Sequence, residues 1–552
     1  MCSNNNNPNR KNIWGYTFDW TPSHLTSTDL HPLTLSYDKL TNDCLDEFDA
    51  LGLTSSSSSS SSDPSPSPSQ NSHQCPLHHH NHHHHQPNDF LHLLQTYHPS
   101  SPSLSTLWKH LTTIPAWVSY PSIARGQAVF YRYAGPAITS LTFHSLLGGM
   151  ASARVVETLA RTGGFGTRVA RRRLLETFQH ILDVTEGVGD GGDESGSDGG
   201  RGWRSTVRVR FLHGMVRRRI MTLAVRNDRD NGRDRDEKGG KGGERGYWDT
   251  QKWGIPINDL DSIATIASFS SALIWMGLPR QGIFLTSQEI NDYLALWRYV
   301  AYLIGVPDTI TLPSSSGGQQ KITPFGSAQE AKVVMESIML SELSHPSETS
   351  AVLANNIIAS LANQPPLRSS ESFLRAQAYW LNGSSLCKAL HIPKPGVWYA
   401  MLVISQCLFF MVFCYSRQAH YLLLKWVPSW GGGPQNEGTE VATGEERYKR
   451  VRRWMRKVVV EMAGGKEADF GFEWVPEWGK YTGSERGKEE GGGGKGKGKG
   501  RGKKGWRDWI ASRNDGSEFR SLKAFLVAST VLGCLVCVGV RGLFLGMVPL
   551  FR

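Results

Sequence analysis

The chain has 552 residues and a formal net charge of +11. It is long enough for two or three average domains, but its low-complexity stretches leave roughly 300 residues able to form a core. Residues 416–523 hold 23 Lys and Arg against 15 Asp and Glu, so +8 of the charge lies there. This region lacks a zinc-finger, RNA-recognition or helix-turn-helix signature, so we expect no specific nucleic-acid partner. A basic region beside a membrane is the better interpretation.

Residues 1–53 form an N-terminal extension without the apolar run of a secretory signal. Residues 54–88 hold eight consecutive serines, a Ser-Pro repeat and the histidine tract His78–His85. We predict a disordered linker, because this composition is poor in core-forming side chains. The histidine tract could bind Zn or Ni, but it lacks the spaced Cys and His pattern of a structural metal site.

Residues 89–415 are predicted to form one all-α domain, because apolar residues recur there with helical spacing. Thr286 and Glu289 form a capping-box start, and Gly305 with Pro307 form a stop, so the helix between them is the best defined. The expected helices are Phe90–Tyr97, Ser152–Thr162, Arg168–Val184, Val207–Val225, Leu260–Met276, Thr286–Ile304, Ala328–Leu343, Glu348–Ala362 and Ser372–Leu381.

Two polar inserts interrupt this domain. Residues 186–202 are rich in Gly and Asp, and residues 226–246 are rich in Arg, Asp and Gly. We expect both to be disordered surface loops that leave the core unchanged. The eight cysteines show no spacing typical of an extracellular disulfide framework, so reduced thiols are expected.

The C-terminal part combines the basic Gly/Lys-rich region 416–523 with a transmembrane segment at 524–550. Ala524–Val540 is an uncharged, mostly apolar run of 17 residues, which suits a short span. Val397–Tyr415 is also uncharged over 19 residues, but Ser405 and Gln406 lie at its centre. It fits either a span or a buried helix. A C-terminal anchor with the helical domain in the cytosol is the simplest topology.

The segment 206–219 contains one histidine, His213, among apolar residues, with Arg210 and Arg217 at helical spacing on either side. The three side chains would share one helical face directed toward an apolar interior. A neutral imidazole can ligate haem iron, and guanidinium groups one turn above and below could bind the two propionates of haem b. The alternative is a core histidine with ordinary hydrogen-bond partners, since a short motif of this kind is weak by itself.

Further short motifs follow one another in a fixed order along the chain. They are Arg173-Leu-Leu-Glu-Thr177, Arg210-Phe-Leu-His213 with Arg217, Trp253-Gly-Ile-Pro-Ile-Asn258, Thr265 with Phe269, and Glu289 through Trp297-Arg298 to Gly305-Val-Pro307. Over Leu104–Tyr415, about half of the chain, this order resembles the rubber-oxygenase (latex-clearing protein) catalytic domain family. That family is shared with the endoplasmic-reticulum-bound oxygenase of mycophenolic acid biosynthesis.

The resemblance implies a globin-like helical domain around non-covalent haem b that uses O2 to cleave a carbon–carbon double bond of an isoprenoid. The residue matching the proximal iron ligand is His213, with Arg210 and Arg217 beside it. Arg173 and Thr177 match the family's Arg-x-x-x-Thr helix. Thr265 matches a threonine on a later helix near the pocket.

Two acidic positions bear on the resemblance. Glu176 stands where latex-clearing proteins carry a lysine that can cap the distal iron site, so distal lysine ligation is not expected. Glu157 falls where those proteins place a glutamate proposed as the base for allylic proton abstraction. From the residues alone, a helix-surface pair with Arg161 at i+4 is the better interpretation of Glu157, and Arg173 and Glu176 belong to a charged helix face.

We therefore predict a haem b-dependent oxygenase at the endoplasmic reticulum membrane, acting with O2 on an apolar or isoprenoid substrate. Its catalytic residues would be Glu157, Arg173, Thr177 and Thr265, with the iron on His213. One alternative is a catalytically silent, membrane-tethered haem sensor or helical scaffold. Another is a lipid-surface protein whose basic loop binds anionic headgroups. Walker A, Gly-x-Ser-x-Gly and His-Glu-x-x-His motifs are absent from the sequence.

Overall fold

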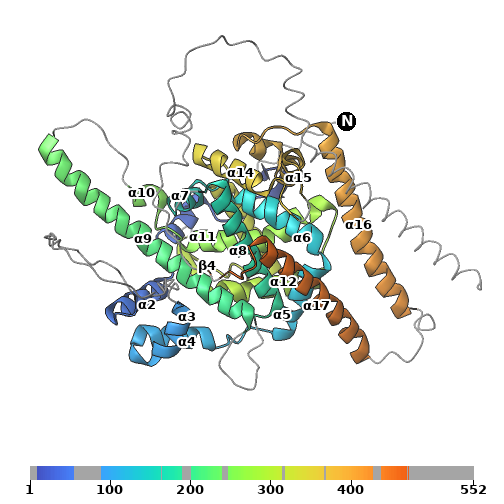
Figure 1. The fold of residues 1–552 in the computed structure, drawn as a ribbon, viewed down its shortest axis with the longest axis horizontal. Coiled ribbons are helices and arrows are strands. Elements are labelled where there is room, and N and C mark those ends of the chain that lie inside the picture. The colour runs from blue at the N-terminus through green and yellow to red at the C-terminus, as the bar shows by residue number, and fades with distance from the viewer. Residues whose placement is uncertain are drawn as a thin grey trace, which may run out of the picture.

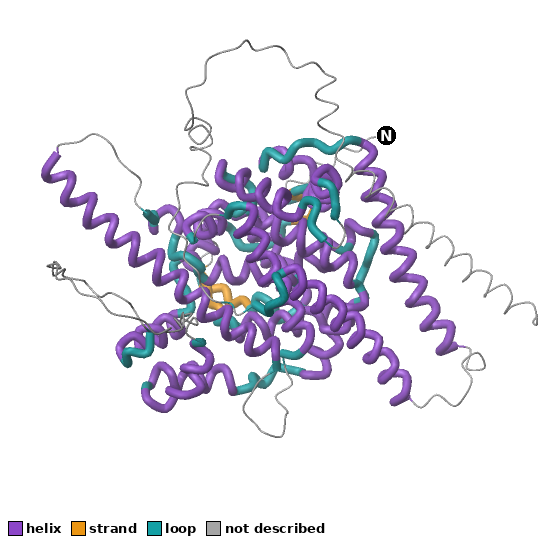
Figure 2. Tube along the Cα trace, viewed as in Figure 1, coloured by secondary structure: helices purple, strands orange, loops and turns teal. Residues whose placement is uncertain are grey.

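In the computed structural model most of the described residues are helical (Figures 1 and 2), so the all-α prediction is confirmed. Strands occur only as two short hairpins among the residues described. The structure describes residues 9–54, 89–162, 165–188, 200–238, 247–313, 318–365, 368–426, 437–468 and 470.

The N-terminal extension is an integral part of the domain. Its side chains Leu25, Leu45 and Phe48 are fully buried, and they belong to the largest core cluster together with residues of the central helices. This segment therefore closes the core and is no appendage. Its elements are β1 (Arg10–Ile13), β2 (Tyr16–Asp19), α1 (Ser27–Leu30), η1 (His31–Thr34) and α2 (Lys39–Ala50).

The central helices follow in the order that the apolar pattern predicts, with additional helices between residues 102 and 147. The π-helical turns η3 and η4 lie at the ends of α6 and α11. The elements are α3 (Phe90–Tyr97), η2 (His98–Ser100), α4 (Pro102–Thr112), α5 (Tyr120–Arg132), α6 (Ala134–Ser140), η3 (Leu141–Leu147), α7 (Ala153–Arg161), α8 (Thr167–Glu186), α9 (Arg201–Lys238), α10 (Thr250–Trp253), α11 (Asp259–Phe269), η4 (Leu273–Gly277), η5 (Pro279–Gln281), α12 (Ser287–Leu303), β3 (Ile310–Pro313), β4 (Gln319–Ile322), α13 (Ala328–Glu342), α14 (Glu348–Leu361), α15 (Glu371–Ala389), α16 (Val397–Trp426) and α17 (Glu437–Met462).

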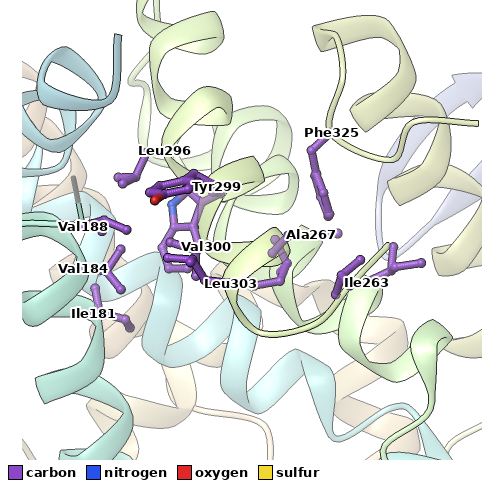
Figure 3. Packing of buried hydrophobic residues seen from close by; sticks show 14 of the residues in the cluster. Ile181, Val184, Val188, Ile263, Ala267, Leu296, Tyr299, Val300, Leu303 and Phe325 are labelled. Carbon is purple, nitrogen blue, oxygen red and sulfur yellow. The ribbon is translucent and has the colours of Figure 1, made fainter. Parts of the chain in front are cut away.

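Helix α12 lies at the centre of the fold. It packs most extensively against α5, and it also touches α9, α11 and α13. Figure 3 shows its apolar side chains facing those of α8 and α11. The close approach of α5 requires Gly126, because a Cβ there would lie 2.3 Å from the carbonyl oxygen of Asp292 on α12. The helix begins with the expected capping box, in which Thr286 and Glu289 satisfy each other's backbone N–H groups.

The second polar insert differs from the expectation. Helix α9 runs to Lys238, so residues 226–238 continue a helix instead of forming a loop. The remainder of this insert, most of the insert at 186–202 and the linker 55–88 lie outside the described residues.

Helix α16 corresponds to the uncharged segment for which both a span and a buried helix were open. Within it, Val397–Ser416 has a mean hydropathy of 2.1, yet only 17% of this window is buried. A second apolar window at Asp259–Gly277 is 67% buried, as expected of a core helix. The predicted transmembrane segment 524–550 lies outside the described residues.

Candidate functional site

An apolar cavity of about 370 Å³ lies between α8, α11, α13 and the η3 turn. Its wall is composed almost entirely of aliphatic, aromatic and small side chains, and two histidines interrupt it. Such a cavity suits an apolar ligand, with a few polar groups to fix its orientation. The lining residues include Ile138, Leu141, His144, Leu159, Leu174, Thr177, Phe178, Ile181, His213, Thr265, Phe269, Met335, Ile338 and Met339.

His213 borders this cavity from helix α9. The residue is half-buried, and it lines the cavity. Burial lowers the pKa of His213 to about 4; Arg217 acts in the same direction and Asp38 opposes it. The imidazole is therefore neutral at physiological pH. Within the described part of the chain its ring nitrogens have no hydrogen-bond partner, which leaves a lone pair available to a ligand.

His144 is a second imidazole in the cavity wall, and the sequence reasoning did not single it out. It lies on the η3 turn, where its Nδ1 is 3.1 Å from Asn382 Oδ1 and 3.2 Å from the carbonyl oxygen of Leu381. Both partners are acceptors if Asn382 donates its amide to Phe143, as the 2.8 Å contact indicates. The proton then resides on Nδ1, and Nε2 carries a lone pair. Burial lowers the pKa of His144 to about 3, with a further contribution from Arg280.

Thr177 and Thr265 both line the cavity, one from α8 and the other from α11. Each hydroxyl donates to the carbonyl four residues earlier, Thr177 to Arg173 at 2.9 Å and Thr265 to Asp261 at 2.8 Å. The hydroxyl protons are thus used within the helices. Both oxygens keep acceptor lone pairs, so these threonines can accept a hydrogen bond from a bound molecule but do not offer a free donor.

Arg210 and Arg217 do not line the cavity. Arg210 donates to both carboxylate oxygens of Asp38, at 2.7 and 2.8 Å, and to Thr41. Arg217 donates to the carbonyls of Pro256 and Ile257 and to Asn42. Both guanidinium groups are directed to protein acceptors and not to a position for propionates. They fix helix α9, and with it His213, against the N-terminal segment and the loop before α11.

Arg173 is also outside the cavity lining. Its guanidinium donates to the hydroxyl and carbonyl oxygens of Thr162, both at 2.8 Å, and it lies over the ring of Phe165. Burial lowers the pKa of Arg173, with Glu176 opposing. The side chain therefore joins the end of α7 to α8, the helix that carries Thr177.

Neither acidic candidate reaches the cavity. The carboxylate of Glu157 pairs with Arg161 and accepts a long hydrogen bond from Thr349. Glu176 lies 3.4 Å from Arg172 on the same helix and is partly exposed. Both follow the helix-surface pairing that was the alternative for these positions. Lysine is absent from the described residues that line the cavity.

A buried ion-pair cluster holds three cavity walls together. Arg154 on α7 donates to Asp261 on α11 and to Glu342 on α13, both at 2.8 Å. Burial raises the pKa of Asp261, and Arg154 opposes this increase. Because the three partners come from three different helices, this cluster fixes the spacing of the walls. None of them appeared among the predicted site residues.

A match to the family of "ER-bound oxygenase mpaB/B'/Rubber oxygenase, catalytic domain" spans residues 131–406, half of the chain. The chain belongs to this family. A comparison with solved structures finds "Latex Clearing Protein LCP in the closed state" at 13% identity and a TM-score of 0.42, covering 80% of this chain and 93% of that one. Among curated proteins no match was found.

Membership of the rubber-oxygenase catalytic domain family makes the protein an oxygenase, and thus an oxidoreductase. The match contains every predicted site residue and also His144. It excludes the N-terminal segment that holds Arg210 in place. Within the described ranges, no group of three or more His, Cys, Asp and Glu could hold a metal ion, so the chain alone does not supply a multi-ligand metal site there.

Proposed function

We propose that the protein is a haem b-dependent oxygenase that uses O2 to cleave a carbon–carbon double bond of an apolar, isoprenoid-like substrate. His213 would be the proximal iron ligand. The observation that carries the proposal is a neutral imidazole without protein hydrogen-bond partners in the wall of an apolar cavity. The family to which the chain belongs supports the oxygenase chemistry.

The apolar lining and His213 suit the ring of a haem, whereas none of the described lining residues is an Arg or Lys that could pair with its propionates. A haem supplies four of its own nitrogen ligands, so the protein needs to provide one strong axial ligand and an apolar pocket. His213 offers the axial nitrogen, and aliphatic side chains such as Leu174, Ile181 and Ile338 offer the apolar surface. When bound, the haem would supply the activation of O2. The chain's own task is to hold the iron ligand, orient the substrate and exclude water.

Arg210 and Arg217 act in this proposal as positioning residues. They hold α9 through Asp38, Asn42 and two backbone carbonyls, so they set the direction of the His213 ring without touching the cofactor. Arg173 has the same role for Thr177 through its bonds to the end of α7.

His144 supplies the second polar contact within the cavity. Its Nε2 lone pair can accept a hydrogen bond from a water molecule or a polar group of the substrate. Glu157 is not assigned the base role that the resemblance implies, because its carboxylate is held by Arg161 outside the cavity lining. Thr177 and Thr265 add two weaker acceptors near the apolar walls.

The location proposed for the protein is the endoplasmic reticulum membrane, with the helical domain in the cytosol. The family description names endoplasmic-reticulum-bound members, and helix α16 carries an apolar, uncharged window that is largely unburied. The basic region that follows this helix suits the cytosolic side of a membrane.

Absorption spectroscopy of the purified full chain tests the haem proposal. We expect a Soret band in the wild type, its loss in His213→Ala, and its recovery in His213→Gly on addition of imidazole. His110→Ala is the matched control, since His110 is a partly buried histidine stacked on Tyr302 and does not line the cavity. A wild type that binds no haem under haem-replete expression, or a His213→Ala spectrum identical to the wild type, contradicts the proposal.

Turnover separates an enzyme from a haem-binding sensor. Polyprenyl substrates should give O2 consumption together with carbonyl products at the cleaved double bond. A haem-loaded protein that yields neither would favour the sensor and overturn the catalytic part of the proposal.

A further inference from the structure

Helix α16 has one face packed on the domain. Val403, Cys407 and Cys414 are buried on that face. Phe410 lies against Gly135 of α6, where any larger residue would collide with its ring, and Met411 lies against Gly282 after η5 in the same way. Because these contacts extend over several turns, α16 is attached to the domain along its length and is not a free-standing helix.

The opposite face of α16 is apolar and exposed. Its members are three, four or seven residues apart, so they lie on one side of the helix, with Ser405 between Met401 and Leu408. Within 397–416 there is no Asp, Glu, Lys or Arg to interrupt it. We call this stripe the outer face; it consists of Val397, Trp398, Met401, Leu408, Phe409, Val412 and Phe413, with exposed fractions from 37% to 81%.

Two exposed aromatic residues outside α16 lie beside this helix. The backbone N–H of Phe284, a residue that is 65% exposed, donates to the hydroxyl of Tyr415 on α16. Trp380 on α15, 39% exposed, lies beside Cys407. Figures 1 and 2 show α16 running along the outside of the molecule. A contiguous apolar surface of this kind marks a membrane or protein contact.

We propose that the outer face docks on a lipid bilayer, with α16 lying in the plane of the membrane interface and not crossing it. A crossing helix would carry its packed neighbours α6, α15 and η5 into the hydrocarbon region, together with their polar loops. A helix with one packed and one apolar face can instead embed that face alone. The acyl chains of the bilayer can cover the apolar outer face, and no protein partner of complementary shape is needed.

Charge on the following helix supports a lipid surface as the occupant. Helix α17 exposes Arg450, Arg453 and Lys457 together with Trp454, of which 61% is exposed. Basic residues beside an exposed tryptophan are typical of contact with anionic headgroups at the interface. In Figure 1, α16 runs to the lower right of the molecule, and α17 returns from there toward the centre.

The position of the outer face also suggests a route for the substrate. This part of the inference rests on the proposed function. Helix α6 contacts Phe410 of α16 through Gly135 and lines the cavity through Ile138. A bilayer on the outer face would thus be separated from the cavity by α16 and α6. An apolar substrate dissolved in that bilayer would have to pass between these two helices to reach the cavity wall.

Site-specific photo-crosslinking of the full chain on vesicles tests the docking. The photoreactive amino acid p-benzoylphenylalanine replaces Phe409, Phe413 or, as the matched control, Leu51, an exposed apolar residue after α2. The vesicles contain phosphatidylcholine and phosphatidylserine, and the vesicle-bound protein is analysed. We expect lipid adducts at positions 409 and 413 and none at position 51. Adducts at all three positions, at none, or with a second copy of the chain would overturn the proposal.

The in-plane orientation has its own readout. A fluorescent amino acid at Trp398 or at Phe413, near the two ends of the outer face, is quenched by lipids brominated at known depths. Equal depth profiles at the two positions are expected for a helix in the plane of the membrane. Profiles centred on opposite leaflets would mean that the helix spans the membrane and would overturn the orientation. Neither experiment requires bound haem, so a failure here is distinct from a failure of the proposed function.

Discussion

The two cavity histidines are held differently, and this difference suggests a division of roles. His144 is fixed by Asn382 and the backbone of Leu381, so its ring has a defined tautomer and direction. The ring of His213 is directed only by the packing of α9, which Arg210 and Arg217 hold in place. An imidazole without a fixed hydrogen bond can adjust its ring to a metal, whereas a fixed one is suited to orient a second molecule.

His144→Ala is expected to keep the Soret band and to lower turnover of a polyprenyl substrate by about tenfold or more. The haem would remain because His213 still provides the iron ligand. A lost hydrogen bond in an enclosed site is worth about 1–3 kcal/mol, and 1.4 kcal/mol corresponds to a factor of ten. O2 uptake and product formation measure the effect, with His110→Ala as control. Unchanged turnover, or loss of haem from His144→Ala, would refute this role.

His213 could be recognised from the sequence because helical spacing is local. Its apolar neighbours on α9 predict an inward-facing ring, and the ring does border the cavity. The partner of Arg210 could not be recognised in the same way, since Asp38 lies 172 residues earlier in the chain. His144 was overlooked because Gly135, Pro136 and a double glycine surround its segment and obscure the apolar period. It is nevertheless another isolated histidine in an apolar run.

At the level of elements, a helix end can be predicted from the sequence where nearby side chains form hydrogen bonds with its free backbone N–H groups. The capping box of Thr286 and Glu289 gives the start of α12 correctly. The π-helical turn η3 has no such signature, because it depends on packing against α11 and α15. Turns of this type often occur at functional sites, and this one carries His144 into the cavity wall.

Arg154→Met tests whether the ion-pair cluster maintains the cavity walls. Removing Arg154 leaves the buried Asp261 and the half-buried Glu342 without their counter-charge, and breaking a buried pair typically costs about 3–5 kcal/mol. We expect a correspondingly lower free energy of unfolding in urea. Arg201→Met, which breaks an exposed pair with Glu467, should cost no more than about 1 kcal/mol. Equal losses in the two variants would show that the cluster is not a structural support.

For the whole molecule, buried neutral histidines predict that acid destabilises the fold. Burial lowers the pKa of His144 to about 3, and burial together with the nearby His213 lowers that of His180 to about 4. An unfolded histidine has a pKa of about 6.5, so the unfolded state binds more protons below that pH. The stabilisation is complete above pH 6.5 and is lost as the pH falls toward 4. At pH 5 each histidine should cost about 2 kcal/mol.

Urea denaturation at pH 7 and pH 5 measures this dependence. His180→Gln should reduce it, because glutamine does not titrate and can still contact the hydroxyl of Ser205, 2.8 Å from the His180 ring. If the variant and the wild type lose the same free energy between the two pH values, His180 is not a source of the acid sensitivity.

The contact between Asp38 and Arg210 determines how the protein can be shortened. A truncated form that begins at Leu104 includes the whole family match but lacks the carboxylate that neutralises Arg210 inside α9. An uncompensated guanidinium in that position would cost roughly 3–5 kcal/mol and loosen the helix bearing His213. A preparation of such a fragment without haem colour would therefore indicate a destabilised helix α9. Recombinant forms should begin before the first hairpin, at or before Asn9.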